Sequence, residues 1–286
     1  MELLLNLATK TSIYIIFLLA LNSLMVGKTN LWAIGNIVYI SLGCFLTGYF
    51  STVLPSPNYL YLMFLLVPVI VALVSLLFFF ASRVFKKDFF LFFSLFYIEL
   101  NFVTNKLVAG SSGYSNIMRP AGLSSNVSLF CIVFILMLAL SFMMRRVDRS
   151  RLAQLHTIIR NNELLASSWG IDIKKEQLPI FIASAVISGI CGIFFAFCTF
   201  GADPNLFTTS NIIVLFTLII FGGIDSVRGS IVAGLFFVLF TYFIEEVLFT
   251  QFPVAAPKVA QIVFGLLLVV TPLILPKGLF GKRSLE

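Results

Sequence analysis

The chain has 286 residues, of which 60% are hydrophobic and only 11% are charged. In a soluble globular domain about a quarter of all residues are charged, so this composition excludes that class. The formal net charge is +7, which fits the Lys and Arg excess of cytoplasmic membrane-protein loops, and no sizeable polar domain is present that could bind nucleic acid.

Apolar runs long enough to cross a bilayer follow one another along the chain. They predict an all-α fold, a polytopic transmembrane helical bundle of about nine spans that forms a single domain over residues 1–286. The first run lacks a convincing small-x-small cleavage site, so we expect it to be retained as a span. The nine runs cover residues 11–26, 31–50, 59–82, 89–106, 127–144, 178–200, 209–221, 230–248 and 259–275.

The distribution of Lys and Arg predicts how the bundle is oriented. We place the polar segment, defined as residues 145–177, in the cytoplasm. Alternation of the spans then puts 15 of the 19 Lys and Arg residues on the cytoplasmic side. Only Lys10, Lys106, Arg119 and Lys258 fall outside. The positive-inside bias therefore predicts an N-terminus outside and a C-terminus in the cytoplasm.

The polar segment is basic and compatible with a helix. Residues Arg160 to Gly170 are typical of a short helix that ends at a glycine. Leu164, Leu165 and Ser168 lie three or four residues apart, so one face can be apolar or small. Two interpretations stay open, namely a solvated helix at the membrane surface and a docking surface for another protein.

One stretch of the polar segment resembles a known family. Residues 159–171, IRNNELLASSWGI, are similar to the ATPase-coupling loop IRENEIAAEALGI of ABC importer permeases of the branched-chain amino acid (Liv, LivM-like) type. Thr157 and Ser167 depart from that pattern, where the family often has Arg and Glu. The residues that match, and that the resemblance assigns to ATPase coupling, are Arg160, Asn162, Glu163, Ala166, Gly170 and Ile171.

Four further stretches resemble the same family in chain order. Residues 27–45 match at Gly27, Gly35, Asn36 and Gly43, and residues 110–117 resemble the external loop GSDGLSGI. Residues 222–229 resemble GGLGSLWG, with Asp225 and Arg228 as departures, and residues 275–281 resemble the terminal FPRGLxG. The break at 222–229 is too polar to face lipid, so we expect a turn at the cytoplasmic surface that includes Gly222, Gly223, Ser226 and Gly229.

Candidate pathway residues come from two spans. Gly35 and Gly43, with Asn36 beside them, lie close to one helix face and leave room for another helix or for a solute; simple packing of small residues is the alternative. Glu99 lies within the fourth span near Tyr97 and Asn101. An acid within a span usually faces protein or a water-filled path. A structural pairing with Lys106 is the alternative.

The resemblance implies a translocation subunit rather than an enzyme. Gly27-Lys28-Thr29 resembles the end of a P-loop, but Asn22 occupies the position that needs Gly, so ATP must be bound by other chains. We therefore expect a permease of the bacterial cytoplasmic (inner) membrane for branched-chain amino acids or similar small polar solutes. Its partners would be a homologous permease subunit, two cytoplasmic ATPase subunits, an external solute-binding protein and membrane lipid, with no cofactor, metal or nucleic acid.

Two alternative functions stay open from the sequence. One is an ion-coupled secondary transporter that uses Glu99 as a proton or cation site. The other is a membrane scaffold that does not transport and recruits a partner through its polar segment.

Overall fold

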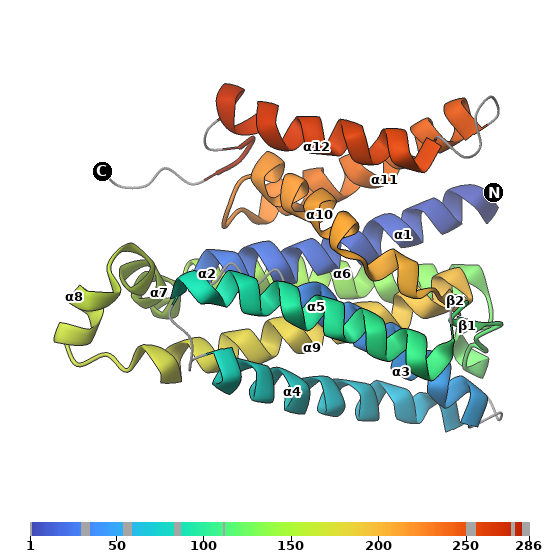
Figure 1. Cartoon of the computed structure of the whole chain (residues 1–286), viewed down its shortest axis with the longest axis horizontal. Helices are drawn as coiled ribbons and strands as arrows, with labels where there is room; N and C mark the ends of the chain where they lie inside the picture. The colour runs from blue at the N-terminus through green and yellow to red at the C-terminus, as the bar shows by residue number, and fades with distance from the viewer. Residues whose placement is uncertain are drawn as a thin grey trace.

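The computed structural model describes residues 2–29, 35–53, 59–82, 87–110, 112–249, 256–275 and 278–281. The described chain is almost entirely helical, and its long helices lie side by side (Figure 1). The helices are α1 (Glu2–Leu18), α2 (Gly27–Thr29), α3 (Asn36–Val53), α4 (Met63–Ser82), α5 (Lys87–Ala109), α6 (Asn126–Asp148), α7 (Arg151–Asn161), α8 (Glu163–Ser168), α9 (Ile173–Thr199), α10 (Thr209–Gly222), α11 (Val227–Phe249) and α12 (Ala256–Ile274). A π-helical stretch, Leu19–Val26, joins α1 to α2.

Each of the nine predicted apolar runs coincides with a helix of the described residues, when α1, the π-helical stretch and α2 are taken as one. Length and composition make six helical segments candidates for crossing a membrane, and α10 and α12 contribute two shorter apolar segments. The chain is therefore a helical, multi-pass membrane protein. The number of nine spans and the side of each terminus stay predictions. The six candidates are Glu2–Val26, Asn36–Val53, Met63–Ala81, Asn126–Asp148, Ile173–Thr199 and Val227–Ile244.

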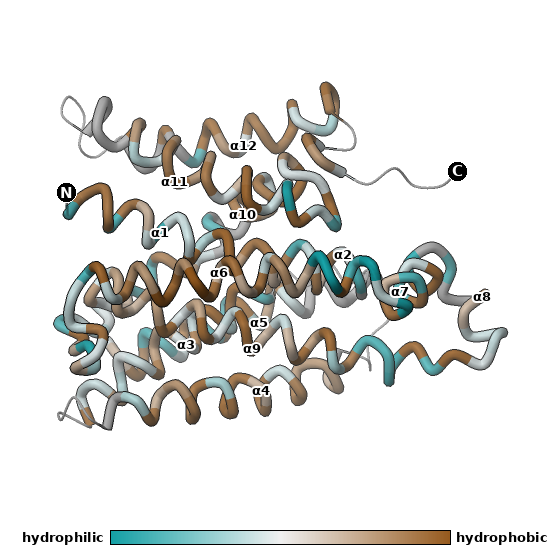
Figure 2. The backbone as a smooth tube through the Cα atoms, turned by 180° about the vertical axis from the view of Figure 1, so that it is seen from behind, coloured by the Kyte–Doolittle hydropathy of each residue, from teal (hydrophilic) through white to brown (hydrophobic). Residues whose placement is uncertain are grey.

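Large apolar side chains are exposed on α4, α6 and α12, and much of the backbone of these helices has the brown colour of hydrophobic residues in Figure 2. An apolar surface this extensive is not tolerated in water by a soluble protein but is expected against lipid tails. Hydrophilic residues gather instead around α2 and α7 (Figure 2). The exposed side chains include Leu65, Leu77, Ile135, Phe142, Leu266 and Leu273.

The two ends of the bundle differ. At one end β1 (Tyr114–Ser115) pairs antiparallel with β2 (Gly201–Ala202), so the predicted external loop lies against the turn that follows α9. The N-terminal end of α1 lies at this same end (Figure 1). The other end carries α7 and α8 and is called the α8 end from here on.

Glycines allow α3 and α9 to cross at close range. A Cβ at Gly43 would overlap the carbonyl oxygen of Gly189, and a Cβ at Gly192 would overlap the carbonyl oxygen of Ile40. Apolar helices in lipid gain little from the hydrophobic effect and associate through such close backbone packing. Gly43 therefore makes room for another helix, which was one of the two interpretations of this residue.

We expect Gly43→Ala to destabilise the protein because the added methyl group must displace the α9 backbone. Forcing extra volume into a packed core costs about 1–3 kcal/mol. Gly265→Ala is the matched control, since nothing lies within 4 Å of a Cβ at Gly265 on α12. Thermal unfolding of both variants in the same detergent measures the difference. Equal melting temperatures for the two variants would contradict the close crossing.

Candidate functional site

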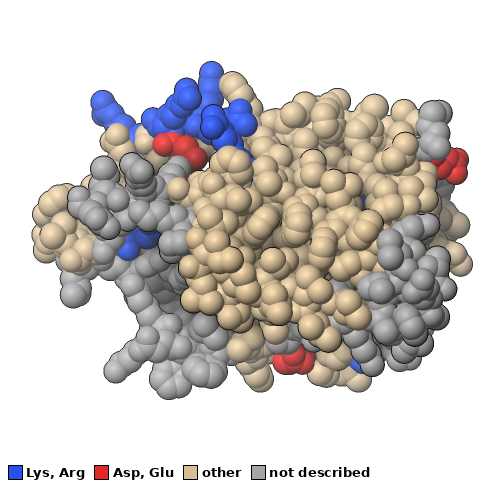
Figure 3. Space-filling view, turned by 90° about the horizontal axis from the view of Figure 1, so that it is seen from above, with Lys and Arg blue, Asp and Glu red and all other residues tan. Residues whose placement is uncertain are grey.

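The polar segment forms the α8 end of the molecule. Figure 3 shows Lys and Arg side chains gathered over this end, while most of the remaining described surface in that view carries no charge. The exposed residues at the junction of α6 and α7 are Arg145, Arg146, Arg149 and Arg151. A basic surface next to long apolar helices suits the boundary between a membrane and water.

The predicted single helix over Arg160–Gly170 is wrong in detail, because the structure divides it. Asn162 has an extended backbone, with φ −154° and ψ 101°, and separates α7 from α8. Its side chain accepts a hydrogen bond from the Leu165 backbone N–H at 3.1 Å. Asn is a favoured N-cap because its oxygen satisfies an unpaired N–H of the first turn. The sequence pattern alone did not reveal this cap.

α8 is a short helix that projects apolar side chains outward. Ala166 is fully buried, and its carbonyl oxygen accepts from the backbone N–H groups of Trp169 and Ile171. Leu165 is 43% exposed and Trp169 is 65% exposed. Gly170 follows with φ +77°, a conformation that glycine adopts without strain, and ends the helix. Glu163 is the first residue of α8, and its side chain lies outside the described part of the structure.

Four charged side chains meet beneath α7 and form what we call the charged cluster: Lys28, Asp148, Arg160 and Asp225. Lys28 Nζ lies 2.6 Å from Asp148 Oδ1 and 3.0 Å from Asp225 Oδ1. Arg160 Nη1 lies 3.6 Å from Asp225 Oδ2 and donates to the Gly27 carbonyl oxygen at 3.3 Å. The two positive and two negative charges balance. The cluster joins the polar segment to α2, to the end of α6 and to the turn before α11.

Lys28 is 3% exposed and Asp225 is 4% exposed, so the centre of the charged cluster is removed from water. A buried charge is tolerated only when it is paired, and removing one partner leaves the other charge without compensation. The relative positions of α2, α6 and α7 are therefore tied to one another through these side chains.

The predicted turn over residues 222–229 lies beside the charged cluster. Asn22, in the π-helical stretch, donates to the Gly223 carbonyl oxygen and to Ser230 Oγ, each at 3.0 Å, and accepts from the Asp225 backbone N–H. Ser226 Oγ accepts from the Gly229 backbone N–H at 3.0 Å and so caps α11. Buried polar groups that are paired in this way fix one arrangement of the backbone.

Two close contacts complete this turn. Gly222 and Gly229 face each other, and a Cβ on either would overlap the backbone of the other. The backbone N–H groups of Leu279 and Phe280 donate to the carbonyl oxygens of Phe221 and Gly222, at 2.9 and 3.1 Å. Four of the five motifs noted in the sequence therefore have residues that meet at the α8 end.

His156 lies on the inner side of α7 and is 3% exposed. Burial lowers the pKa of its imidazole, Glu176 opposes this shift, and Lys28 adds to it. Its Nδ1 has no hydrogen-bond partner among the described residues. The imidazole is therefore neutral near pH 7 and packs as part of the interface between α7 and the bundle.

The candidate pathway residues of α3 face the protein interior. Asn36 is fully buried and donates to Ser184 Oγ and Ser188 Oγ on α9, at 3.3 and 3.0 Å. A Cβ at Gly35 would lie 3.4 Å from the Tyr97 ring, so α3 also approaches α5 here. Gly35, Asn36 and Gly43 therefore lie within helix contacts rather than on an open surface.

The candidate residues of α5 fall on two faces. Asn101 Oδ1 accepts from Ser41 Oγ at 2.8 Å and from Asn105 Nδ2 at 2.9 Å, which makes a buried polar contact with α3. The Tyr97 ring packs against the Phe78 ring, with 4.4 Å between the ring centroids and an interplanar angle of 34°. Glu99, by contrast, is exposed on the surface of the chain. Within the described residues, no group of three His, Cys, Asp or Glu side chains is placed to hold a metal ion.

Comparison with known sequence families gives one match. The family described as the permease component of the branched-chain amino acid transport system matches residues 3–272, which is nearly the whole chain. The chain belongs to this family. No curated protein and no solved structure matches it.

Asp225 differs from the residue that the permease-family pattern has at the same position. The pattern GGLGSLWG has Gly where this chain has Asp225, and Asp225 adopts φ +59°. That conformation is costly for most residues and is tolerated best by Gly, Asn and Asp. The Asp225 carboxylate also compensates the charge of Lys28. The residue that departs from the pattern therefore takes the backbone shape that the pattern requires and adds an ion pair.

Sequence reasoning missed three members of the charged cluster: Lys28, Asp148 and Asp225. Arg160 was selected, but for contact with an ATPase rather than for a contact within the chain. The departure at Asp225 was the available signal. It did not reveal a partner, because Lys28 and Asp225 are 197 residues apart in the chain.

Lys28→Met should destabilise the protein by about 3–5 kcal/mol, because Asp148 and Asp225 then lose the ammonium group that lies between their carboxylates. Asp225→Asn should also destabilise it, leaving an excess positive charge. The double variant restores charge balance, so its loss should be smaller than the sum of the two single losses. Thermal unfolding in one detergent measures all three variants.

Lys175→Met is the control for this prediction, since Lys175 pairs with Asp172 at an exposed site, with 84% of its own side chain accessible. Its melting temperature should stay at the wild-type value. Strict additivity of Lys28→Met and Asp225→Asn would show that the two residues do not act together.

Proposed function

We propose that the chain is one permease subunit of an ATP-driven ABC importer in the bacterial cytoplasmic membrane. It works with a homologous permease subunit, two cytoplasmic ATPase subunits and an external solute-binding protein. The α8 end faces the cytoplasm, the nine helices cross the membrane, the N-terminus lies outside and the C-terminus inside. The exposed Arg residues at the α8 end support this orientation, because Lys and Arg accumulate in cytoplasmic loops.

The observation that carries the proposal is the exposed apolar surface of α8 outside the long apolar helices. Leu165 and Trp169 point away from the bundle, although nothing in the described chain requires them there. A short helix with an aromatic anchor and an aliphatic neighbour has the composition of a protein-binding hot spot. We take an ATPase subunit as this partner, because the chain belongs to a family of transport permeases.

The charged cluster connects α8, through α7, to the helices of the bundle. Movement of α8 is passed to α7 across the single residue Asn162, and α7 is held to Asp225 and to the Gly27 carbonyl oxygen by Arg160. Asp225 belongs to the turn between α10 and α11, and Gly27 to the end of the first long helix. ATP-driven closure of the ATPases would therefore shift these helices together between outward-open and inward-open arrangements.

The exposed face of α5 is the surface on which we place the pathway. Glu99 is flanked on this face by Phe96, Leu100 and Val103, all of them exposed. A carboxylate in the middle of a membrane helix is costly against lipid, and such residues face protein or water. The second permease subunit packs beside this face and encloses a water-filled path with it. The cargo is a branched-chain amino acid or a similar small polar solute.

Replacing Leu165 and Trp169 by Arg should abolish ATP hydrolysis coupled to transport and leave folding intact, because both side chains are already exposed. The measurement is solute-stimulated ATPase activity in proteoliposomes that contain all subunits. Met118→Arg is the control, because Met118 is 54% exposed near the opposite end of the bundle. Normal coupled activity in the Leu165, Trp169 variant would rule out α8 as the coupling helix.

Glu99→Gln should lower ATP-dependent solute uptake roughly tenfold, as the loss of a charged hydrogen bond of about 1.5 kcal/mol would do. Thr104→Ala, at an exposed position of the same helix, should leave uptake unchanged. The same assay separates the alternatives. Uptake that persists without ATPases and collapses with the ion gradient would identify a secondary transporter. No flux with every subunit present would identify a scaffold.

A further inference from the structure

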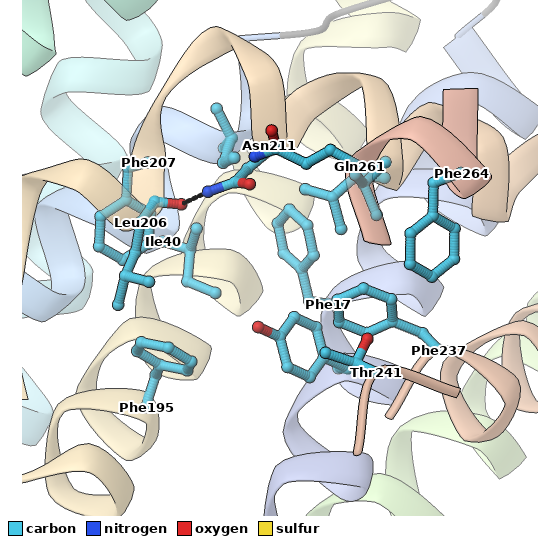
Figure 4. Close-up of a pocket in the computed structure, with 14 residues that line it drawn as sticks. Phe17, Ile40, Phe195, Leu206, Phe207, Asn211, Phe237, Thr241, Gln261 and Phe264 are labelled. Carbon is cyan, nitrogen blue, oxygen red and sulfur yellow. Dashed lines mark hydrogen bonds between the residues drawn. The ribbon is translucent and has the colours of Figure 1, made fainter. Parts of the chain in front are cut away.

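A cavity of about 340 Å³ lies between the helix layers, away from the α8 end (Figure 4). Its described lining comes from α1, α3, α9, α10, α11, α12 and the 3-10 helix Pro204–Phe207. It is more than twice as large as the roughly 150 Å³ apolar cavity that is known to bind benzene. A molecule of about two fused rings therefore fits its size. The lining side chains comprise Tyr14, Phe17, Phe195, Phe207, Phe237, Phe264 and eight others.

Aromatic rings make the wall of the cavity continuous. The ring centroids of Tyr14 and Phe237 are 4.7 Å apart, those of Phe237 and Phe264 are 5.5 Å apart, and those of Phe195 and Phe207 are 6.0 Å apart. Edge-to-face and tilted rings at these distances present both ring edges and ring faces to a bound group. A planar ring can therefore contact the wall on several sides.

The polar side chains that line the cavity among the described residues carry no charge. Asn211 lies at the cavity and donates to the Leu206 carbonyl oxygen at 2.8 Å, and Gln261 is exposed near the start of α12 (Figure 4). The Thr241 hydroxyl oxygen is buried and has no hydrogen-bond partner among the described residues. A buried hydroxyl without a partner costs free energy that a ligand with a hydrogen-bonding group recovers.

We propose that this cavity binds an uncharged organic molecule of one or two rings that carries a hydrogen-bonding group. A free amino acid does not suit it, because none of the fourteen lining residues is charged and a zwitterion would lose its hydration without a counter-charge. A lipid acyl tail would leave the Thr241 hydroxyl unpaired. The site is thus distinct in chemistry from the cargo that the family description names.

The cavity also lies in a different part of the chain from α8 and the charged cluster. Its residues lie in the half of the bundle that carries β1 and β2, whereas the charged cluster lies at the α8 end (Figure 1). Binding therefore does not require ATPase subunits, and the proposal stands or falls independently of the transport function.

Equilibrium dialysis of radiolabelled indole tests this site, with the whole chain in lipid nanodiscs and empty nanodiscs as the reference for partitioning. Indole is an uncharged bicyclic ring with one N–H donor. We expect saturable binding that an excess of L-tryptophan, which adds a zwitterion to the same ring, does not displace. Val214→Phe places a ring in the cavity and should weaken binding at least tenfold. Thr241→Val keeps the shape of the site and should weaken binding roughly fivefold.

Val232→Phe is the matched control, because Val232 is 37% exposed on α11 and does not line the cavity. It should bind indole as the wild type does. Three results would each overturn the proposal: uptake of indole equal to that of empty nanodiscs, equal affinity in Val214→Phe and wild type, or displacement by L-tryptophan at concentrations similar to those of indole.

Discussion

The structure depends on the pairing of Lys28 with two carboxylates in a site almost closed to water. Asp148 ends α6, and Asp225 lies in the turn before α11, so a single ammonium group holds together segments from three parts of the chain. Arg160 extends the same contact to α7. A buried charge is stable only while it is paired, so separating the helices would leave these charges without compensation. The α8 end is therefore a coupled unit rather than a set of loops.

Within this unit the two helices of the polar segment have different surroundings. α8 has an exposed apolar surface, and α7 behind it has a buried inner side with His156 and Ile159. One helix is suited to meet a partner, and the other is fixed to the bundle. The break at Asn162 lets the two helices point in different directions, which a single continuous helix would not allow.

The membrane part follows different physics. Glycines on α3 and α9 let the two backbones pack closely. This packing is needed because the hydrophobic effect does not drive helices together in lipid. Elsewhere the bundle is less tightly filled, and the aromatic cavity lies where α10 to α12 meet the helices of the first half. Glu99 is exposed on α5, where a carboxylate within a membrane helix would be costly against lipid. The glycine contacts, the cavity and the exposed acid therefore lie in different parts of the bundle.

The sequence by itself determined the membrane class, the place of the nine long helices and the family, because apolar run length and ordered local motifs are properties of neighbouring residues. It also indicated the turn at 222–229 and the glycine stop at Gly170. Only the tertiary structure decided which side chains meet. Lys28 and Asp225 are paired across 197 residues, Glu99 and Asn101 are two residues apart but face different surroundings, and the rings of the cavity come from five separate segments. Contacts of this kind depend on how helices pack in space. The spacing of residues along one sequence does not show which distant residues meet.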